Sequence, residues 1–210
     1  MNAETPRTVG IVLFDQFELL DVFGPAEMLG LPKSRFRLQM IGPDKEPVTS
    51  AQGPRVVPDG AFSDVEKLDL VLVPGGMGTR KEVENTDLLA WLRHIAVGAE
   101  YVASVCTGSA LLARAGVLDG RRATSNKSAF EWVCSQGPKV DWVKKARWVE
   151  DGKFWTSSGV SAGIDMALAL IERVSGSELA EALAKGTEYD RHTEPSWDPF
   201  SDLYEFTRKL

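Results

Sequence analysis

The chain has 210 residues, of which 43% are hydrophobic and 26% are charged, the proportions of an ordinary globular protein. The length suits a single domain over residues 1–210, with a core at about 8–174 and a C-terminal helix and tail at 177–210. Thirty Asp and Glu against 24 Lys and Arg give a net charge of −6. This charge argues against a nucleic-acid partner, because nucleic-acid-binding surfaces are basic.

The sequence also predicts the compartment. No window approaches the ~18–20 apolar residues of a membrane span, and the first ten residues contain no cationic stretch leading into an apolar one. We therefore expect a cytoplasmic protein with no membrane partner. The two cysteines, Cys106 and Cys134, lie in separate predicted elements and are expected to be free thiols.

Apolar runs rich in Val, Ile and Leu alternate with segments of helical periodicity, which is typical of a mostly parallel sheet covered by helices. In chain order, the first half predicts a strand at 8–14, a helix at 19–31, a strand at 36–41, a turn-rich segment at 42–58 that could hold a short hairpin, a strand at 68–73, a helix at 85–97 and a strand at 100–105. The second half predicts helices at 107–115, 127–135, 161–174 and 178–189, with a hairpin at 146–157. Asp151-Gly152 suits the type I′ turn of that hairpin.

The tail at 191–206 mixes aromatic residues with prolines. Its Trp197 and Phe200 could dock on a partner subunit, although aromatic tails more often fold back on their own domain.

The strongest functional signal is the segment Ser104-Val105-Cys106-Thr107-Gly108, between a predicted strand and a predicted helix. Small residues two before and two after the centre are what a tight strand-to-helix elbow requires, and such an elbow holds a nucleophile in a strained, exposed conformation. The positive end of the following helix points at Cys106, so we expect its thiol pKa to fall from about 8.5 toward roughly 3.5–7.5. The alternative is a buried structural cysteine.

Two further segments lie at predicted carboxyl ends of strands, where open parallel sheets collect ligands. Pro74-Gly75-Gly76-Met77 could be a simple turn, or its backbone could form an oxyanion hole with the N–H of Thr107. Asp21 could merely stabilise the dipole of its helix, or its carboxylate could hold or move a proton beside Cys106. Glu18, three residues earlier, is a competing candidate.

Other chemistries find little support. His94 is expected on an exposed helix face and His192 lies in the tail, so a Cys–His dyad is disfavoured. The cysteines and histidines show none of the short zinc spacings, and no Walker or dinucleotide fingerprint is present. We therefore expect no metal and no cofactor.

These segments resemble the ThiJ/PfpI superfamily, which includes the parkinsonism protein DJ-1 and class I glutamine amidotransferase-like domains. The resemblance rests on Pro74-Gly75-Gly76, on Ser104-Val105-Cys106-Thr107-Gly108-Ser109 and on Asp21 in a D-x-x-G-P motif, and it runs from about residue 8 to 174. It implies a flavodoxin-like three-layer sandwich, with helices on both faces of a mostly parallel sheet and a cysteine nucleophile elbow. The family commonly forms homodimers, so a homodimer is expected.

Within the superfamily, the S-V-C-T-G elbow and the D-x-x-G-P motif are similar to those of isocyanide (isonitrile) hydratases. The resemblance implies that Cys106 is the nucleophile, that Asp21 is the acid/base partner, and that the N–H groups of Gly76 and Thr107 are oxyanion donors. The Thr107 hydroxyl could also position the aspartate or the incoming group. The implied small-molecule reaction adds water to an organic isocyanide and gives an N-formamide through a Cys106 thioimidate. The expected binding residues are Gly75, Met77, Asn126 and Phe23, with Trp132 as a further apolar wall.

The sequence also departs from its relatives. Many carry Thr-His-Trp where this chain has Ser125-Asn126-Lys127, and protease-type relatives place His at the position of Thr107. Asn cannot act as a base near neutral pH, which weakens protease, glutaminase and glyoxalase-type interpretations. The alternatives to hydration are a redox-responsive, stress-protective protein in which Cys106 is oxidised, a glyoxalase- or deglycase-type enzyme, and a ligand sensor.

Overall fold

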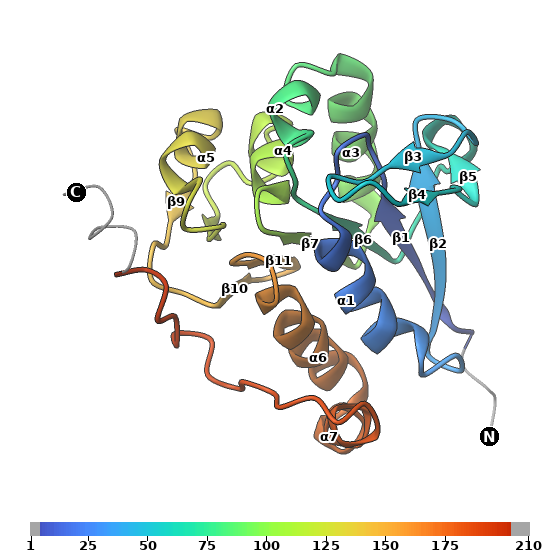
Figure 1. Cartoon of the computed structure of the whole chain (residues 1–210), viewed down its shortest axis with the longest axis vertical. Helices are drawn as coiled ribbons and strands as arrows, with labels where there is room; N and C mark the ends of the chain where they lie inside the picture. Colours follow the sequence, from blue (N-terminus) through green and yellow to red (C-terminus); the bar gives the residue numbers. More distant parts are fainter. Residues whose placement is uncertain (1–4, 203–210) are drawn as a thin grey trace.

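A seven-stranded sheet forms the centre of the protein, whose computed structural model describes residues 5–202 (Figure 1). Its strands follow the order β10-β11-β7-β6-β1-β2-β5. Their bounds are β1 Arg7–Val12, β2 Phe36–Gly42, β5 Gly60–Ala61, β6 Leu70–Val73, β7 Tyr101–Val105, β10 Trp148–Asp151 and β11 Phe154–Ser157. Neighbouring strands pair in parallel, except for β10 and β11, which form an antiparallel hairpin. The predicted mostly parallel sheet is confirmed.

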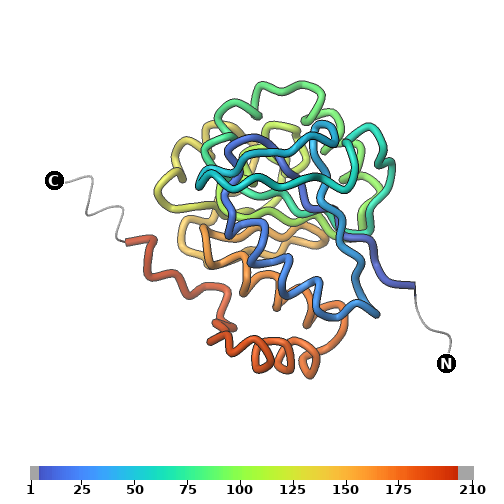
Figure 2. Tube along the Cα trace, turned by 45° about the vertical axis from the view of Figure 1, so that its right-hand side comes forward, coloured from blue at the N-terminus to red at the C-terminus, as the bar shows by residue number. Residues whose placement is uncertain are grey.

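Helices cover both faces of this sheet, as Figures 1 and 2 show. On one face α1 (Leu19–Gly30) packs beside α6 (Ala162–Ser175), and α7 (Ser177–Gly186) packs on α6. The other face carries α2 (Thr79–Glu82), α3 (Thr86–Gly98), α4 (Gly108–Arg114) and α5 (Phe130–Gln136). The architecture is the three-layer α/β sandwich that the resemblance implied.

Smaller elements decorate the loops. β3 (Val48–Thr49) and β4 (Arg55–Val56) form the short antiparallel hairpin predicted within 42–58. β8 (Arg122–Ala123) and β9 (Asp141–Trp142) pair in parallel, and a 3-10 turn, η1, covers Phe62–Asp64. β5, β8, β9 and the single-turn helix α2 were not predicted, because elements of two to four residues are too short to show a periodic pattern.

Two predicted bounds differ from the structure for identifiable reasons. The first strand ends at Val12, two residues before the predicted end at Phe14, because the chain turns toward α1 and Gln16 adopts a positive φ of 61°. The helix predicted over 127–135 begins at Phe130. The residues before it, 124–126, instead run into the candidate site described below.

The order of the strands determines where a site can form. β1 lies between β2 and β6, so the chain moves outward in one direction after β1 and in the other direction after β6. Open parallel sheets bind ligands at such a reversal, outside the carboxyl ends of the strands. α1 follows β1, the glycine turn follows β6, and α4 follows β7. The three segments that the sequence singled out therefore meet at one edge of the sheet.

After α7, residues 187–202 contain no helix or strand and run back along the β10 side of the molecule (red in Figure 1). The N–H of Arg147 donates to the carbonyl of Pro195 at 2.7 Å, and the Trp197 ring stacks on His192 with 4.2 Å between centroids. The tail thus folds back on its own domain at Trp197, while Phe200 remains 45% exposed. Within the described residues, no helix combines the length and apolar character needed to cross a membrane.

Candidate active site

Cys106 occupies a strained position between β7 and α4. Its φ of 57° lies in the left-handed region, which costs a non-glycine residue about 1–2 kcal/mol. Hydrogen bonds on both sides hold this conformation. The Cys106 N–H is shared between the carbonyls of Ser157 and Ser158 at 3.2 and 3.3 Å, and its carbonyl accepts from the hydroxyls of Ser125 at 2.8 Å and Ser109 at 3.2 Å.

Gly108 explains why the elbow needs a small residue two positions after the cysteine. A Cβ added there would lie 2.1 Å from the carbonyl oxygen of Val73 and 2.7 Å from that of Pro74. Both are backbone atoms of the neighbouring strand end, which cannot move aside. The predicted strand-to-helix elbow is therefore present in the structure, and close backbone packing against β6 shapes it.

The glycine turn after β6 is tied to the elbow by hydroxyl groups. The N–H of Gly76 donates to Thr107 Oγ1 at 3.1 Å, and Thr79 Oγ1 donates to the same oxygen at 3.1 Å. Gly76 has a φ of 125°, and a Cβ there would lie 2.4 Å from the carbonyl oxygen of Gln16, so only glycine fits. The Thr107 hydroxyl thus connects the two loops.

Asp21 projects from the first turn of α1 toward the glycine turn and the elbow, and it is fully buried. Its Oδ2 accepts from the N–H of Gly75 at 2.8 Å. A Cβ on Gly75 would lie 2.9 Å from that oxygen and 2.6 Å from the backbone nitrogen of Thr107, so the carboxyl group and the elbow meet across a bare glycine. Burial, reinforced by the charge of Glu18, raises the pKa of Asp21 from 3.8 to about 8. Asp21 is therefore mostly protonated at neutral pH.

The pKa of the Cys106 thiol is raised, and the expected lowering was wrong. Cys106 is 7% exposed, and burial is the largest cause, followed by the negative charge of Asp21 when that group is ionised. The N–H and hydroxyl of Thr107 act in the opposite direction but do not compensate. The expectation considered the helix end and ignored desolvation, which disfavours any buried anion. The two groups therefore tend to keep their protons, and ionisation of either one opposes ionisation of the other.

Glu18, the competing carboxylate, has a weaker electrostatic effect on the Cys106 thiol than Asp21 has. It is half-buried, and its Oε1 accepts from Nε2 of Gln52 at 2.6 Å. The charge of Glu18 raises the pKa of Cys106 less than the charge of Asp21 does. Of the two carboxyl groups, Asp21 therefore has the stronger electrostatic effect on Cys106.

Asn126 lies on the other side of the sulfur. A Cβ on Gly159 would fall 3.0 Å from Cys106 Sγ and 2.2 Å from Asn126 Nδ2, so the amide and the sulfur flank the same glycine. The Asn126 Oδ1 accepts from Ser128 Oγ at 2.5 Å and from the N–H of Ala129 at 3.2 Å. These bonds orient the side chain so that its NH₂ group faces Gly159 and the sulfur.

Arg80, on α2, is a neighbour of the site that the sequence did not reveal. Its guanidinium lies 4.2 Å from the ring centroid of Trp132 and donates to the carbonyl of Gly76 at 3.3 Å and to Thr79 Oγ1 at 3.1 Å. Burial lowers the pKa of Arg80, and the negative charge of an ionised Cys106 acts in the opposite direction, so the two groups are electrostatic neighbours. A basic residue four positions after the glycine pair was a possible signal, but α2 is too short to be predicted.

The remaining predicted residues are exposed or half-buried. Met77 is 64% exposed on the loop before α2. Phe23 is 42% exposed and lines a groove of about 520 Å³ between α1, α6 and α7, together with Leu31. His94 is exposed, as predicted, and His192 stacks on Trp197.

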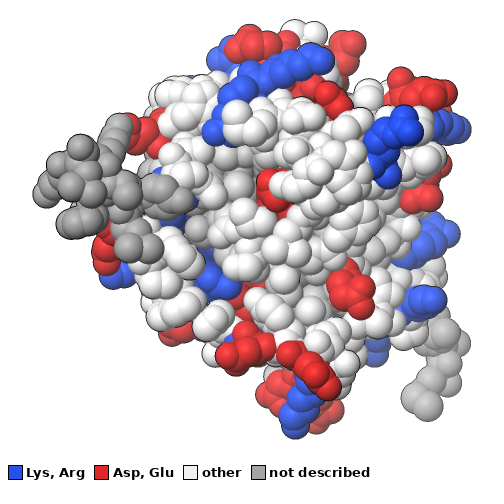
Figure 3. Space-filling model, viewed as in Figure 1, with Lys and Arg blue, Asp and Glu red and all other residues white. Residues whose placement is uncertain are grey.

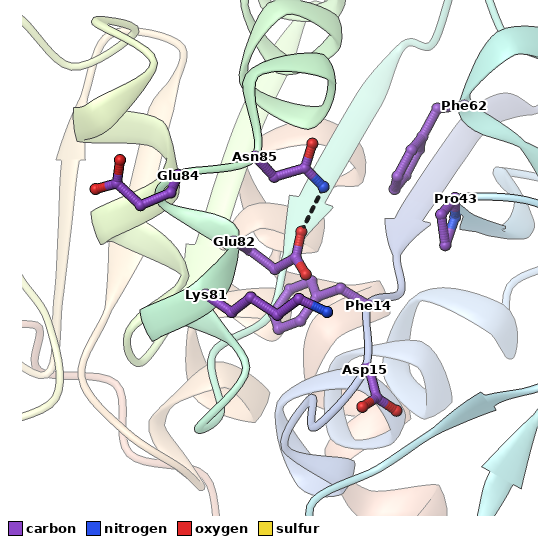
Figure 4. A pocket seen from close by; sticks show the side chains of 8 residues that line it. All are labelled: Phe14, Asp15, Pro43, Phe62, Lys81, Glu82, Glu84 and Asn85. Atoms are coloured by element: carbon purple, nitrogen blue, oxygen red, sulfur yellow. Dashed lines mark hydrogen bonds between the residues drawn. The ribbon is translucent and has the colours of Figure 1, made fainter.

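A different hollow lies beyond α2, as Figure 4 shows. Its volume is about 440 Å³, and its lining combines apolar rings with charged side chains: Phe14, Asp15, Pro43, Phe62, Lys81, Glu82, Glu84 and Asn85. Asn85 donates through Nδ2 to Glu82 at 2.7 Å, and its Oδ1 caps α3 by accepting from Leu88 N–H. These contacts give Glu82 and Asn85 a structural role.

Figure 3 views the face of Figure 1 with charged residues coloured. Lys, Arg, Asp and Glu gather mainly around its rim, while the middle is largely uncharged apart from a few isolated acidic side chains. Both cysteines are free thiols, as predicted. Among residues 5–202, no cluster of three or more His, Cys, Asp and Glu side chains is arranged to hold a metal ion.

A mostly parallel α/β sandwich with a cysteine at a strand-to-helix elbow and a buried acid beside it defines a class of cysteine-elbow proteins. The profile of the DJ-1/PfpI family matches residues 7–173. The chain belongs to the DJ-1/PfpI family. A crystal structure of a ThiJ/PfpI family protein from Pseudomonas syringae is similar, with a TM-score of 0.83 at 26% identity, covering 97% of this chain and 87% of that one.

Two curated relatives show the range of functions attached to this fold. The isonitrile hydratase of Pseudomonas putida is 37% identical over 182 residues, covering 86% of this chain and 78% of that protein. The HTH-type transcriptional regulator GbdR of Pseudomonas aeruginosa is 29% identical over 191 residues, covering 89% of this chain. The chain spans only about half of that regulator, 52% of its length.

Proposed function

We propose that this protein hydrates organic isonitriles, R–N≡C, to N-formamides, with Cys106 as nucleophile and Asp21 as acid and base. The observation that carries the proposal is a buried carboxylic acid, mostly protonated at neutral pH, beside a buried thiol at a strained elbow. The 37% identity with an isonitrile hydratase supports the same reaction class. The largely uncharged middle of the face in Figure 3 suits a neutral organic substrate.

The first half of the reaction forms a covalent adduct. The Cys106 sulfur bonds to the terminal carbon of the isonitrile, and that carbon takes one proton from the Cys106–Asp21 pair. The product is the thioimidate R–N=CH–S–Cys106, in which carbon has gained the sulfur and a hydrogen. A neutral Asp21 is essential here, because a carboxylate could not donate that proton and would oppose ionisation of the thiol.

The second half releases the product. Asp21, which keeps one proton after the thiol proton has gone to carbon, donates it to the imidate nitrogen and takes a proton from the water whose oxygen adds to the thioimidate carbon. Collapse of the tetrahedral adduct breaks the C–S bond, returns a proton to the Cys106–Asp21 pair and gives R–NH–CHO. The balance is one isonitrile and one water in, one formamide out, so no cofactor is needed.

In this scheme backbone N–H groups stabilise the negative charge that develops on oxygen. The N–H of Thr107 acts directly on the Cys106 sulfur and is the first donor we assign. The N–H of Gly76 is the second, and it becomes free when the Thr107 hydroxyl turns away from it. We assign Gly75 and Asn126 to the walls around the reacting atoms and Met77 to contacts with the organic substituent, whereas Phe23 lines the separate groove between α1, α6 and α7.

The test incubates the purified protein with a simple aliphatic isonitrile and measures formamide by mass spectrometry. We expect formamide formation by the wild type. A folded wild type that yields no formamide contradicts the proposal. The same preparation is given methylglyoxal and, separately, mild peroxide, because turnover of the first indicates a glyoxalase- or deglycase-type enzyme and selective oxidation of Cys106 indicates a redox-responsive protein. The raised pKa of Cys106 argues against ready oxidation, since the thiolate is the oxidised species.

We also propose that the protein is a cytoplasmic homodimer. α1 and its C-cap residue expose Leu20, Phe23 and Leu31, each more than 40% accessible, along one groove. A row of large apolar side chains of this kind is typical of a surface covered by another protein. Light scattering that gives the mass of one chain contradicts the dimer.

A further inference from the structure

The segment after α7 contributes a buried ion pair that reaches the candidate site. We call residues 190–202 the C-terminal strap. Besides the bond from Arg147 N–H to Pro195, the strap is held where the N–H of His192 donates to Asp165 Oδ1 at 2.9 Å. Farther along, Asp198 is 3% exposed although it belongs to a segment without helix or strand.

Asp198 pairs with Lys127. The Lys127 Nζ lies 3.1 Å from Asp198 Oδ2, and each side chain is 2% exposed. The same ammonium donates to Thr124 Oγ1 at 2.8 Å, to the carbonyl of Ser125 at 3.0 Å and to the carbonyl of Ala146 at 3.1 Å. Many relatives carry Trp at position 127, and the structure shows that the lysine of this chain has partners within the protein for its buried ammonium.

The residues that Lys127 holds are the residues that hold the elbow. Ser125, whose carbonyl accepts from Lys127, donates its hydroxyl to the carbonyl of Cys106 at 2.8 Å. Asn126, between them in sequence, faces Cys106 Sγ across Gly159. A continuous chain of contacts therefore leads from Asp198 in the strap, through Lys127 and Ser125, to the strained backbone of Cys106.

We propose that Asp198 and Lys127 are positioning residues for Cys106, and that the strap completes the elbow. The inference rests on the proposed role of Cys106 as nucleophile, but not on the identity of the substrate. The ammonium provides donors to three acceptors on two loops, and the Asp198 carboxylate supplies the counter-charge that allows it to remain buried. Loss of either partner frees the 124–126 segment, which lets the elbow relax and admits water to the sulfur.

The experiment separates positioning from stability with three variants. Asp198→Asn leaves a buried ammonium without its counter-charge, and Asp198→Glu is the conservative rescue. The double variant Lys127→Met/Asp198→Leu removes both charges, and apolar replacement of a buried ion pair often preserves or improves stability. It nevertheless lacks the donors that hold Thr124 and Ser125.

Two controls accompany these variants. The strap control is Glu172→Gln, which removes the exposed partner of Arg191. The stability control is Phe36→Leu, in β2 on the opposite side of the sheet.

Two readouts are measured on each folded variant, together with its melting temperature. The first is kcat and KM for the isonitrile. The second is the pH dependence of Cys106 alkylation by iodoacetamide, followed on the Cys106 peptide so that Cys134 does not interfere. We expect the double variant to melt near the wild type, with kcat about tenfold lower, KM within threefold, and the alkylation midpoint moved to lower pH because water reaches the sulfur. Asp198→Asn shows the same changes, Asp198→Glu restores part of kcat, and both controls keep the wild-type midpoint.

A double variant with the kcat and alkylation midpoint of the wild type overturns the proposal, because the pair would then only stabilise the fold. The proposal is also overturned if Phe36→Leu, at equal loss of melting temperature, shifts both readouts as far as Asp198→Asn does. If the wild type makes no formamide, only the proposed reaction fails. The alkylation arm still decides whether the strap positions Cys106.

Discussion

The protein buries two kinds of ionisable pair, and the two kinds behave in opposite ways. Lys127–Asp198 and Arg147–Asp165 are pairs of opposite charge whose members hydrogen-bond to each other or to nearby backbone. Cys106 and Asp21 are two acids of like sign, buried together, and the pKa of each is raised. Opposite charges stabilise each other when buried, whereas like acids can be buried only by keeping protons. The first arrangement suits structure, and the second suits proton transfer.

Removing the Cys106 sulfur should give the largest loss of formamide formation. Cys106→Ala should lower formamide formation by at least roughly a thousandfold, because the covalent route is lost. Cys134→Ala is the matched control, since Cys134 is a free, half-buried thiol outside the elbow, and it should retain activity. Substantial turnover by a folded Cys106→Ala protein would show that the acid pair is not the reacting centre.

Asp21→Asn should separate activity from stability. The amide cannot exchange a proton, so kcat should fall about 10²–10⁴-fold. Between pH 3.8 and about 8 the unfolded chain ionises at Asp21 while the folded protein keeps the proton, so ionisation progressively favours unfolding as the pH rises through this window. Removing this group should therefore raise the free energy of unfolding at pH 7 by up to about 4 kcal/mol, a gain that disappears toward pH 4.

Urea unfolding at pH 4 and pH 7 measures that change. An Asp21→Asn protein that is less stable than the wild type at pH 7 would mean that Asp21 is ionised in the folded state. The two kinds of pair would then not differ as described.

The pH dependence of kcat/KM for the wild type should reveal the ionisation of Asp21. Above a pH of about 8, where Asp21 loses its proton, kcat/KM should decline by about tenfold per pH unit. A rate that rises steadily to pH 10 would indicate that only thiol ionisation limits the reaction. Initial rates from pH 6 to pH 10, with unfolding monitored at each pH, distinguish the two profiles.

Arg80→Met should have the smallest effect. Arg80 is exposed on one side, so loss of its charge near the sulfur should lower kcat roughly tenfold, below the 10²–10³-fold effect of removing a preorganised oxyanion-hole donor. Lys81→Met, on the same turn of α2 but lining the hollow of Figure 4, is the control and should retain activity. Equal losses in both variants would assign the effect to α2 and not to the charge near Cys106.

Local sequence patterns predicted the sheet, its main helices and the elbow, because apolar periodicity and small residues around Cys106 act over a few neighbouring positions. The sign of the Cys106 pKa shift could not be predicted, because it depends on burial by segments far away in sequence. Arg80 was missed for a related reason, since α2 is one turn long. The role of Lys127 was equally out of reach, because its partner lies 71 positions later, at Asp198, in a segment without regular pattern.

The strap also has a consequence for biosynthesis. Every strand of the central sheet in the described part of the chain precedes residue 158, and the last helix ends at Gly186. During translation the ribosome can therefore complete both helical layers before it adds Asp198. Lys127 gains its counter-charge only once residue 198 has been added, so a shorter chain would contain every helix and strand of the described sandwich yet lack this buried ion pair.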